Sequence, residues 1–500
     1  MDFLFNAPSG CQINNPIETT YGVPGGVLKG KCLDVLFNGD CLDVGGLCIS
    51  NNDKECNIFL PSSLNLKSVI ARNTGKAGYP SFLKSRKWRR KLIGAAKFLT
   101  LLRRVELNHY EAPGGFVPLS STLIRKECGA EYAKVIDILE RGKVIDVFRS
   151  KDGVESYSNY SGDRFCKKYR IHRRFSEKDW YPVDDDLNII GEDKLAICRV
   201  MARIPGIVKV RAATEAYLYE CLSKVSISAE ADEYLSAFKF RSKASYHQVY
   251  LNLYKMRAGN WFFTRHSDGR IYHNVTNLPA RSAHGNACLN LRQFLRYEGQ
   301  PLIALDISAS QPYFAHTFYS EAKTWDTSAV VTEKIKYLGL FHVPTDSFYL
   351  NFGKECLKGD YTKAMIKDIL LPQVFFAKLW SGKGWRGHHE APWGELGGRI
   401  VEAFQREFPI LFSIICEIKR EDYALCANRL TAIEAEFMFE SICPDLIEKS
   451  GGSIPLITIH DCILTTAPFV DLVQARMNAL FENRYGLGPR IHKKRLDDNA

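Results

Sequence analysis

Apolar residues at helical spacing predict two short helices between residues 118 and 142. The second helix has apolar positions three and four residues apart, at Tyr132, Val135, Ile136 and Leu139, which is the pattern of a helix with one buried face. Ser120 or Ser121 is placed to cap the shorter helix before it, which carries Leu123 and Ile124. Gly129 and Gly142 then predict the two helix ends.

A β-hairpin is predicted directly after these helices. Val144, Ile145 and Val147 begin its first strand, a polar turn at Ser150–Gly153 follows, and the second strand ends near Ile171. Helix, helix and hairpin in this order resemble a winged helix, and the alternative is a small α+β packing module with no DNA contact. The basic residues Lys167, Lys168 and Arg170 favour nucleic acid, because cations that neutralise phosphates release condensed counterions.

The remaining pattern divides the chain into further parts. Residues 1–75 show short apolar runs among Gly, Asn and Pro, which predict small strands and turns, whereas 190–257 are largely helical in pattern. From Trp261 onwards, short strands and Gly turns carry isolated polar side chains. For a chain of 500 residues we therefore predict an α+β protein in four parts. These are a basic N-terminal accessory region (1–110), the winged-helix-like module (111–180), a helical region (181–257) and a C-terminal unit (258–500).

The net charge of +11 makes a polyanion a plausible partner, and its distribution is more specific. One cluster surrounds Trp88, with Arg103 and Arg104 shortly after it: Lys84, Arg86, Lys87, Arg89, Arg90 and Lys91. A second cluster near the hairpin comprises Lys167, Lys168, Arg170, Arg173 and Arg174. Both clusters predict contact with nucleic acid, and solvated or nuclear-localisation sequences are the alternative.

The cysteine content and the apolar runs bear on the compartment. The 15 cysteines form no Cys-x-x-Cys pair and are odd in number, which is typical of reduced thiols. A zinc site among Cys32, Cys41, Cys48 and Cys56 is the weaker alternative. No apolar run of about 18 residues and no basic segment ahead of an apolar stretch is found, so neither a membrane span nor a signal peptide is expected. We expect a cytoplasmic protein, or one of the host cytoplasm if a virus or mobile element encodes it.

Two aspartates stand at the ends of apolar strands and carry the predicted chemistry. Asp306 follows Pro301-Leu-Ile-Ala-Leu, and Asp461 follows Ile454-Pro-Leu-Ile-Thr-Ile-His460, with apolar residues on both sides of the pair His460-Asp461. Carboxylates from separate strands are able to hold two divalent ions about 4 Å apart, which activate an attacking hydroxyl and neutralise a leaving pyrophosphate. Each aspartate alone is also common as a turn residue.

A pair of lysines lies between the two aspartates in the sequence. Lys363 and Lys367 are four residues apart, so on a helix they project from one face, and Phe375 lies eight residues further, near the same face. Two neighbouring ammonium groups repel each other unless an anion joins them, and a triphosphate is an anion of the right kind.

The order of these segments resembles the palm and fingers of family A (DNA polymerase I-like) DNA polymerases and the related phage-type single-subunit RNA polymerases. Thr264-Arg-His-Ser-Asp-Gly269-Arg270 and Asn277-Leu-Pro resemble the segment that touches the primer–template minor groove. Leu291-Arg292-Gln-Phe294 resembles the lead into motif A at Asp306, the lysines resemble motif B, and His460-Asp461 resembles motif C. A helix over Arg429–Ile442 also falls where the family has one. The resemblance covers roughly residues 260–500 and implies a right-hand architecture, in which 181–257 is thumb-like.

The resemblance implies a role for each matched residue. Asp306 and Asp461 would ligate two Mg²⁺ ions, Lys367 would act on the phosphates in catalysis, and Lys363 would hold the outer phosphates. His460, Arg270, Asn277 and Arg292 would contact the primer–template, which is DNA or RNA. Gln311 would exclude a ribose hydroxyl, and Phe375 would border the sugar of the nucleoside triphosphate. The activity implied is that of a DNA polymerase of DNA replication; no proofreading exonuclease is expected, and the sequence names no protein partner.

Several positions depart from the family pattern. Lys363 replaces Arg, Pro372 replaces a Gly and should kink its helix, and Cys462 replaces the Glu or Ser of the family. Leu371 is closer to the RNA polymerases than to the DNA polymerases. Gln311 and Phe375, which lacks a hydroxyl, favour deoxynucleotides. A single-subunit RNA polymerase or primase, and a non-catalytic replication-initiation or regulatory protein with a degenerate palm, are the alternatives.

Overall fold

The computed structural model describes residues 58–74, 85–108, 115–149, 157–160, 164–184, 186–238, 240, 243–279, 289–342, 347–376 and 394–497. Helices and antiparallel strands alternate through the described chain, so the fold is α+β, as predicted. None of the described helices combines the length and the apolar character that crossing a membrane requires. The predicted zinc alternative at Cys32, Cys41, Cys48 and Cys56, and the turn at Ser150–Gly153, lie outside the described residues.

The predicted pair of helices is confirmed. The Ser120 hydroxyl accepts a hydrogen bond from the Leu123 backbone N–H (3.1 Å) and caps α3 (Ser121–Cys128), which Gly129 ends. Helix α4 (Tyr132–Arg141) ends at Gly142. Four strands form one sheet in which β5 is central and pairs with the other three: β2 (Val117–Ser120), β3 (Ile145–Val147), β4 (Tyr157–Tyr160) and β5 (Arg164–Ile171). The two predicted strands pair as β3 and β5, but a further strand, β4, lies between them in the sequence and also pairs with β5.

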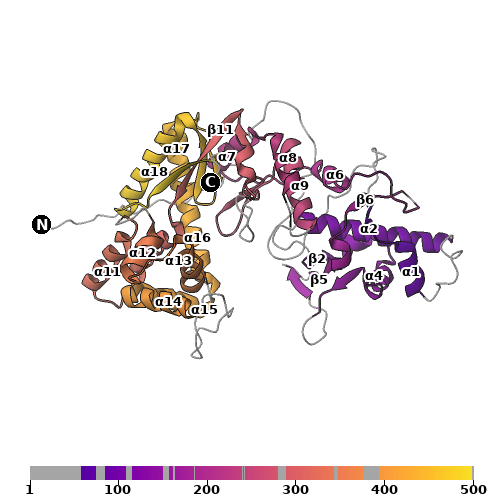
Figure 1. The fold of residues 1–500 in the computed structure, drawn as a ribbon, viewed down its shortest axis with the longest axis horizontal. Helices are drawn as coiled ribbons and strands as arrows, with labels where there is room; N and C mark the ends of the chain where they lie inside the picture. Colours follow the sequence, from indigo (N-terminus) through magenta and orange to yellow (C-terminus); the bar gives the residue numbers. More distant parts are fainter. Residues whose placement is uncertain are drawn as a thin grey trace, which may run out of the picture.

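Helix α2 (Arg86–Asn108) belongs to the same packed unit. It lies against α3, α4, β5 and β1 (Phe59–Pro61), and β1 in turn pairs with β6 (Trp180–Pro182). Helices α1 (Leu66–Asn73) and α5 (Arg173–Ser176) complete the unit. The predicted boundary at residue 110 therefore cuts through a single core, because α2 covers the face that α3 and α4 leave apolar. The unit forms one end of the molecule (Figure 1).

A six-stranded antiparallel sheet organises the C-terminal half of the chain. Its strand order is β12-β13-β11-β10-β7, with β14 paired to β11, and the sheet is curled. The bounds are β7 (Val225–Ile227), β10 (Leu295–Tyr297), β11 (Gln300–Ile307), β12 (Ile457–Ile459), β13 (Cys462–Thr466) and β14 (Ile491–Arg495). The strands predicted to flank Asp306 and Asp461 are β11, β12 and β13.

The region predicted as helical between 190 and 257 contributes to this sheet. It contains α6 (Ala196–Ala202), α7 (Ala213–Ser223), α8 (Glu230–Ala237) and α9 (Lys243–Arg257), but also β7, which pairs with β10. Helix α7 packs on β12. Val225 and Ile227 are buried on either side of exposed Ser226, a strand pattern too short to stand out in the sequence. Part of the region 181–257 is therefore built into the sheet.

The hairpin of β8 (Phe263–Arg265) and β9 (Ile271–His273) precedes the strands β10 and β11 in the chain. The 3₁₀ helix η2 (Leu291–Phe294) leads into β10, while α10 (Ser310–Ala315) and the 3₁₀ helix η3 (His316–Glu321) follow β11.

Five helices then form a separate helical lobe below the sheet (Figure 1). They are α11 (Thr327–Gly339), α12 (Phe348–Cys356), α13 (Lys363–Leu370), α14 (Gly394–Glu407) and α15 (Pro409–Glu421). The lobe has an aromatic core in which Tyr337, Phe348 and Phe404 are among the contacting rings.

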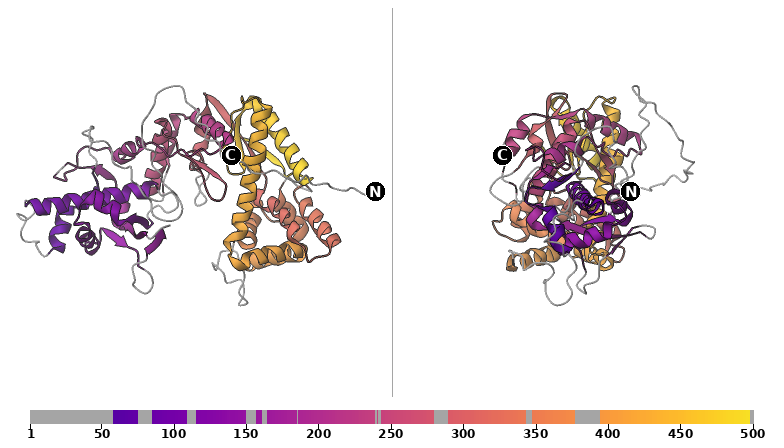
Figure 2. Two further views of the ribbon diagram at one scale, coloured as in Figure 1. Left: turned by 180° about the vertical axis from the view of Figure 1, so that it is seen from behind. Right: turned by 90° about the vertical axis from the view of Figure 1, so that its right-hand side faces the viewer.

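Helix α16 (Ala424–Phe437) runs from the helical lobe back to the sheet, as the long orange helix of Figure 2 shows. It continues through the π-helical turn η5 (Met438–Ile442) into α17 (Cys443–Lys449). The helix predicted over Arg429–Ile442 is thus confirmed. The chain ends its described part with the 3₁₀ turn η6 (Ala467–Phe469), α18 (Val470–Tyr485) and β14.

Candidate active site

Asp306 and Asp461 lie side by side on neighbouring strands. Asp306 on β11 is the register partner of Cys462 on β13, and the Ile307 backbone N–H donates to the Asp461 carbonyl oxygen (3.2 Å). Register partners in an antiparallel sheet carry their side chains on the same face. Asp461 precedes Cys462 directly, at the hairpin tip, and the charge of Asp306 raises the pKa of Asp461, so the two carboxylates lie near each other. Two residues that are far apart in sequence form one acidic site.

The turn that carries Asp461 has an unusual backbone. Ile459 and Cys462 are register partners, so His460 and Asp461 are the two residues at the tip of the β12–β13 hairpin, and His460 has φ 56°. A left-handed conformation is uncommon for residues other than glycine and persists where the surroundings hold it. The edge of the Tyr272 ring lies against the His460 ring (centroids 5.4 Å apart). The hairpin β8–β9, which carries Tyr272, thereby supports the turn of His460 and Asp461.

Negative charge accumulates at this turn. Burial, together with the neighbouring carboxylates of Glu434 and Asp306, raises the pKa of Asp461 to about 8. Asp306 is exposed to solvent, yet the surrounding protein displaces enough water to raise its pKa above the usual value. Burial, Arg270 and Arg292 lower the pKa of His460 to about 4, so His460 is neutral at pH 7. A site with several carboxylates and a neutral histidine is suited to bind cations.

The helical lobe presents its two predicted lysines to Asp306. Thr362 caps α13 by accepting a hydrogen bond from Met365 N–H (3.2 Å), and Lys363 and Lys367 are exposed in the first turns of the helix. Both ammonium groups lower the pKa of Asp306, with Lys367 acting more strongly, so they lie near its carboxylate. The two lysines of α13 therefore lie on the side of the acidic pair where Asp306 stands.

Glu434 on α16 is a site residue that the sequence analysis missed. Its side chain is buried, at 1% exposure, and its charge raises the pKa of both Asp461 and Asp306. Arg270 Nη2 and Nε donate to its Oε1 (2.5 and 3.1 Å). A signal was available in the sequence, since Leu430, Glu434 and Phe437 follow one helix face and Glu434 is the charged member of an otherwise apolar row.

Arg292 and Asn277 lie close to the site, and Arg292 also makes hydrogen bonds that stabilise the local fold. Arg292 Nε donates to the Leu278 carbonyl oxygen (3.2 Å) and Nη2 to that of Thr276 (3.3 Å). Burial lowers the pKa of Arg292, while Cys462 and Asp306 raise it, which places the guanidinium beside the acidic pair. Arg292 thus supports the turn that carries Asn277, whose side chain is half-buried.

Gln311 and Phe375, both predicted to lie near the sugar, differ in their exposure to solvent. Gln311 is half-buried in the first turn of α10, shortly after Asp306. Phe375, in contrast, is fully buried against Phe404 in the helical lobe (ring centroids 5.9 Å apart). The prediction that Phe375 borders the sugar is therefore wrong for this conformation. The cause is Pro372: α13 ends at Leu370, and Leu371–Phe376 follow as a π-helical turn that rotates Phe375 into the core.

The basic clusters of the N-terminal unit also need correction. Arg103 is completely buried, with Nη1 paired to Glu106 Oε2 (2.7 Å) and Nη2 2.8 Å from His247 Nδ1. Arg104 is buried as well, and Lys91 is buried beside Trp88 and Glu131. These side chains connect α2 to its neighbours. The prediction that they contact nucleic acid is therefore wrong. Lys87, Arg89, Arg90, Arg173 and Arg174 remain exposed. Lys84 lies outside the described residues.

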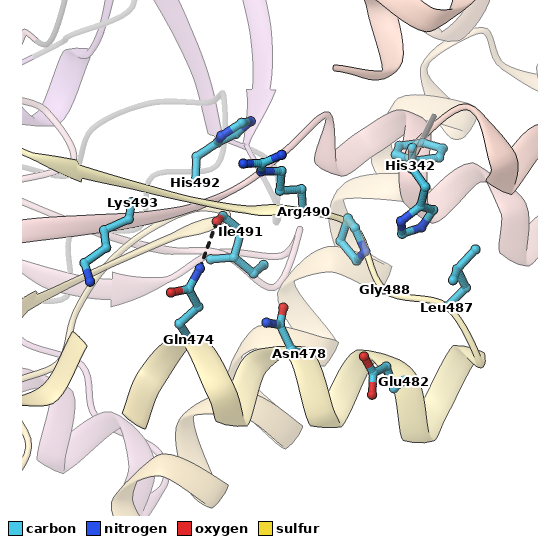
Figure 3. A pocket seen from close by; sticks show the side chains of 12 residues that line it. His342, Gln474, Asn478, Glu482, Leu487, Gly488, Arg490, Ile491, His492 and Lys493 are labelled. Atoms are coloured by element: carbon cyan, nitrogen blue, oxygen red, sulfur yellow. Dashed lines mark hydrogen bonds between the residues drawn. The ribbon is translucent and has the colours of Figure 1, made fainter. Parts of the chain in front are cut away.

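A cavity of about 620 Å³ lies at the sheet edge beside β14 (Figure 3). Gln474, Asn478 and Glu482 of α18 line one wall, and His342 of the helical lobe points into it. His492, at its upper rim, is the register partner of Asp306 on β11, and its pKa is lowered by burial and by Lys363. The cavity therefore extends the polar surroundings of Asp306 beyond the sheet edge.

Comparison with known proteins identifies no family for this chain. No protein-family model matches this chain, and no curated protein matches its sequence. The interpretation of the site therefore depends on its residues and their arrangement.

Proposed function

We propose that the protein is a template-directed nucleotidyl transferase that extends a primer with deoxynucleotides, as a divergent member of the family A and phage-type single-subunit polymerase superfamily. The observation that carries the proposal is the approach of Lys363 and Lys367 from the helical lobe to Asp306, the strand neighbour of the Asp461 turn. In this proposal the six-stranded sheet is the palm, α11–α15 are the fingers, and α8 and α9 are thumb-like.

The acidic pair fits Mg²⁺. Among the described residues no set of three or more His, Cys, Asp or Glu side chains is arranged as a metal site. However, Mg²⁺ typically takes one or two carboxylates and completes its shell with waters and substrate phosphates. Asp306 and Asp461 would hold two ions, which supply activation of the primer 3′-hydroxyl and neutralisation of the pyrophosphate. The raised pKa of Asp461 supports this assignment, because a bound cation relieves the repulsion among the carboxylates.

The remaining side chains bind and orient the substrates. Lys367 stabilises the charge that develops on the leaving phosphates and supplies a proton to them, while Lys363 binds the outer phosphates. Neutral His460 positions the primer terminus, and Arg270 contacts the minor groove next to it. Asn277 and Arg292 support the same primer–template surface.

The choice of sugar depends on Gln311 in this proposal. Its side chain lies in the turn after Asp306, where it would crowd a ribose 2′-hydroxyl. Burial of Phe375 removes the second argument for deoxynucleotides, since a buried ring does not reach the sugar. A single-subunit RNA polymerase or primase is therefore the second candidate, and Leu371, the first residue of the π-helical turn, favours it.

The N-terminal unit is proposed to bind nucleic acid as a winged helix. Its order of α2, β2, α3, α4, β3, β4 and β5 supports the assignment, and Arg173 and Arg174 are exposed after β5. A non-catalytic replication-initiation protein would use the same unit. That candidate does not explain why two lysines from another lobe approach the acidic pair.

A nucleotide-incorporation assay tests the proposal. The full chain is incubated with Mg²⁺, a DNA template with or without a primer, and either dNTPs or NTPs. Extension of the primer with dNTPs supports a DNA polymerase, whereas NTP incorporation supports the RNA polymerase, or the primase if no primer is needed. Absence of incorporation with every combination, for protein that binds the template, would contradict the polymerase proposal and favour the non-catalytic one.

A further inference from the structure

Glu434 joins two parts of the site that have separate tasks. Its Oε1 accepts both hydrogen bonds from Arg270, which lies at the end of the β8–β9 turn. Its Oε2 accepts a hydrogen bond from the Ser310 hydroxyl (2.5 Å), at the start of α10. A buried carboxylate is tolerated when its charge is paired and both oxygens are bonded. This carboxylate links the proposed primer contact to the residue before Gln311.

The backbone next to Ser310 is strained. Ala309 has φ 49°, in the left-handed region that residues other than glycine adopt at a cost. The turn is held by Ser308 N–H, which donates to the Arg490 carbonyl oxygen (2.9 Å), and by the bond from Ser310 to Glu434. A strained turn relaxes when one of its restraints is lost. Because Gln311 follows directly, its side chain moves with any relaxation of this turn.

The Arg270 side is connected to the catalytic turn. Asp268 accepts hydrogen bonds from the Arg270 backbone N–H (3.0 Å) and from the Tyr272 hydroxyl (3.1 Å). The Tyr272 ring in turn lies against His460. The guanidinium of Arg270 is 17% exposed, so a primer terminus beside His460 reaches a group that is already fixed by Glu434.

We propose that Glu434 is a positioning residue that couples primer contact at Arg270 to sugar selection at Gln311. This rests on the proposed polymerase function. In this proposal the bound primer fixes the position of Arg270, and Arg270 fixes the Glu434 carboxylate through two hydrogen bonds. The second oxygen of that carboxylate accepts the Ser310 hydrogen bond and thereby fixes the position of Gln311. Loss of the Ser310 bond disconnects Gln311 while the Arg270–Glu434 ion pair stays in place.

A second ion pair between the same hairpin and the same helical segment provides a matched control. Arg265 Nη1 lies 2.7 Å from Glu440 Oε1, in the turn η5 that continues α16. The Glu440 carboxylate is 55% exposed and has no hydrogen bond to Ser310. Glu440→Gln removes an ion pair of the same kind without touching the turn before Gln311.

The experiment measures kcat/KM for one matched dNTP and NTP on the same primed template, together with Tm. Ser310→Ala and Glu434→Gln are each expected to lower the dNTP preference by at least about fivefold, and the double variant no further than the larger single effect, because both remove one connection. Glu440→Gln is expected to leave the preference unchanged. Gln311→Gly, which opens the space beside the sugar, serves as the positive control with a shift of about tenfold or more.

The outcomes separate this inference from the proposed function. If the wild type incorporates no nucleotide, the proposed function fails and takes the inference with it. If the wild type discriminates and Gln311→Gly shifts the preference, but Ser310→Ala slows both nucleotides equally or has no effect, the coupling is refuted and Glu434 is merely structural. Ser310→Ala retains the ion pair, so the test holds even if a lowered Tm shows that Glu434→Gln is unfolded.

Discussion

His273 Nε2 lies 2.8 Å from the backbone carbonyl oxygen of Thr458, so a histidine of β9 donates a hydrogen bond to the strand that leads into the turn of Asp461. A carbonyl oxygen only accepts, which means that Nε2 carries the proton of the neutral ring. The ring is buried and stacks on Phe263 at an interplanar angle of 7°. Through this bond the β8–β9 hairpin fixes β12, and with it the position of Asp461.

This bond predicts a pH-dependent stability. Burial lowers the pKa of His273 to about 3, against about 6.5 in the unfolded chain. The unfolded state thus binds the proton first, and the contribution of His273 is complete above pH 6.5 and declines as the pH falls towards 3. The stability lost in His273→Gln should therefore shrink by about 1.4 kcal/mol per pH unit below 6.5. Denaturant unfolding of both proteins between pH 5 and 8 measures this, and parallel curves would contradict it.

Asp306→Asn and Asp461→Asn should each abolish nucleotide addition with little effect on DNA binding. Each substitution removes a charge needed for Mg²⁺ and leaves the shape nearly unchanged. Several kcal/mol of transition-state stabilisation correspond to a loss of at least about a thousandfold in kcat. Primer extension and a DNA-binding titration are measured in parallel. Asp471→Asn, at an exposed position of α18, is the control. Substantial activity in either active-site variant would contradict the two-metal assignment.

The two lysines of α13 should differ in kinetics. Lys367→Ala is expected to reduce kcat severely, because Lys367 acts most strongly on Asp306 and is placed to stabilise the transition state. Lys363→Ala is expected mainly to raise the KM for the nucleotide, since Lys363 binds the ground-state triphosphate. Steady-state kinetics test both, with exposed Lys354→Ala on the neighbouring α12 as the control. Equal effects on kcat and KM at both positions would argue against separate roles.

Phe375→Tyr should destabilise the fold without changing the choice of sugar. The ring is fully buried, so the added hydroxyl enters an apolar core without water, at a cost of about 1–3 kcal/mol. Thermal unfolding measures the loss, and the kcat/KM ratio for a dNTP and an NTP is measured on the same protein. A changed ratio with an unchanged Tm would show that Phe375 reaches the nucleotide after all.

Arg173 and Arg174 should determine part of the salt dependence of DNA binding. Replacing both with alanine removes two exposed cations of the N-terminal unit. If both contact phosphates, the slope of log K against log salt falls in magnitude by about two, since each contact contributes about 0.9. DNA-binding titrations at several salt concentrations test this, with Lys323→Ala/Lys354→Ala in the helical lobe as the charge-matched control. An unchanged slope would place these arginines off the nucleic-acid path.

The sequence was most informative where local rules decide the structure. The Ser120 cap, the helix ends at Gly129 and Gly142, and the strands around Asp306 all follow from neighbouring residues. The proximity of Lys363 to Asp306 was predicted only through the resemblance, because no local pattern places one helix against a distant strand.

The wrong predictions have tertiary causes. Phe375 was placed by counting residues along a regular helix, and the π-helical turn after Pro372 changes that count. Arg103 belonged to a basic run in the sequence, yet its partner His247 comes from α9, far along the chain. Glu434 looked like an ordinary helix residue because Arg270 and Ser310 approach it from two other segments.

The pairing of β11 with β13 also has a consequence for how the chain folds. These neighbouring strands are separated in sequence by every helix from α10 to α17, so their contact closes a loop that contains the whole helical lobe. Closing so long a loop costs more entropy than forming the local contacts inside the lobe, and contacts distant in sequence form slowly. The lobe is therefore expected to collapse before the strands meet. Until then, a partly folded chain carries each aspartate alone, and the acidic pair is assembled only with the final strand pairing.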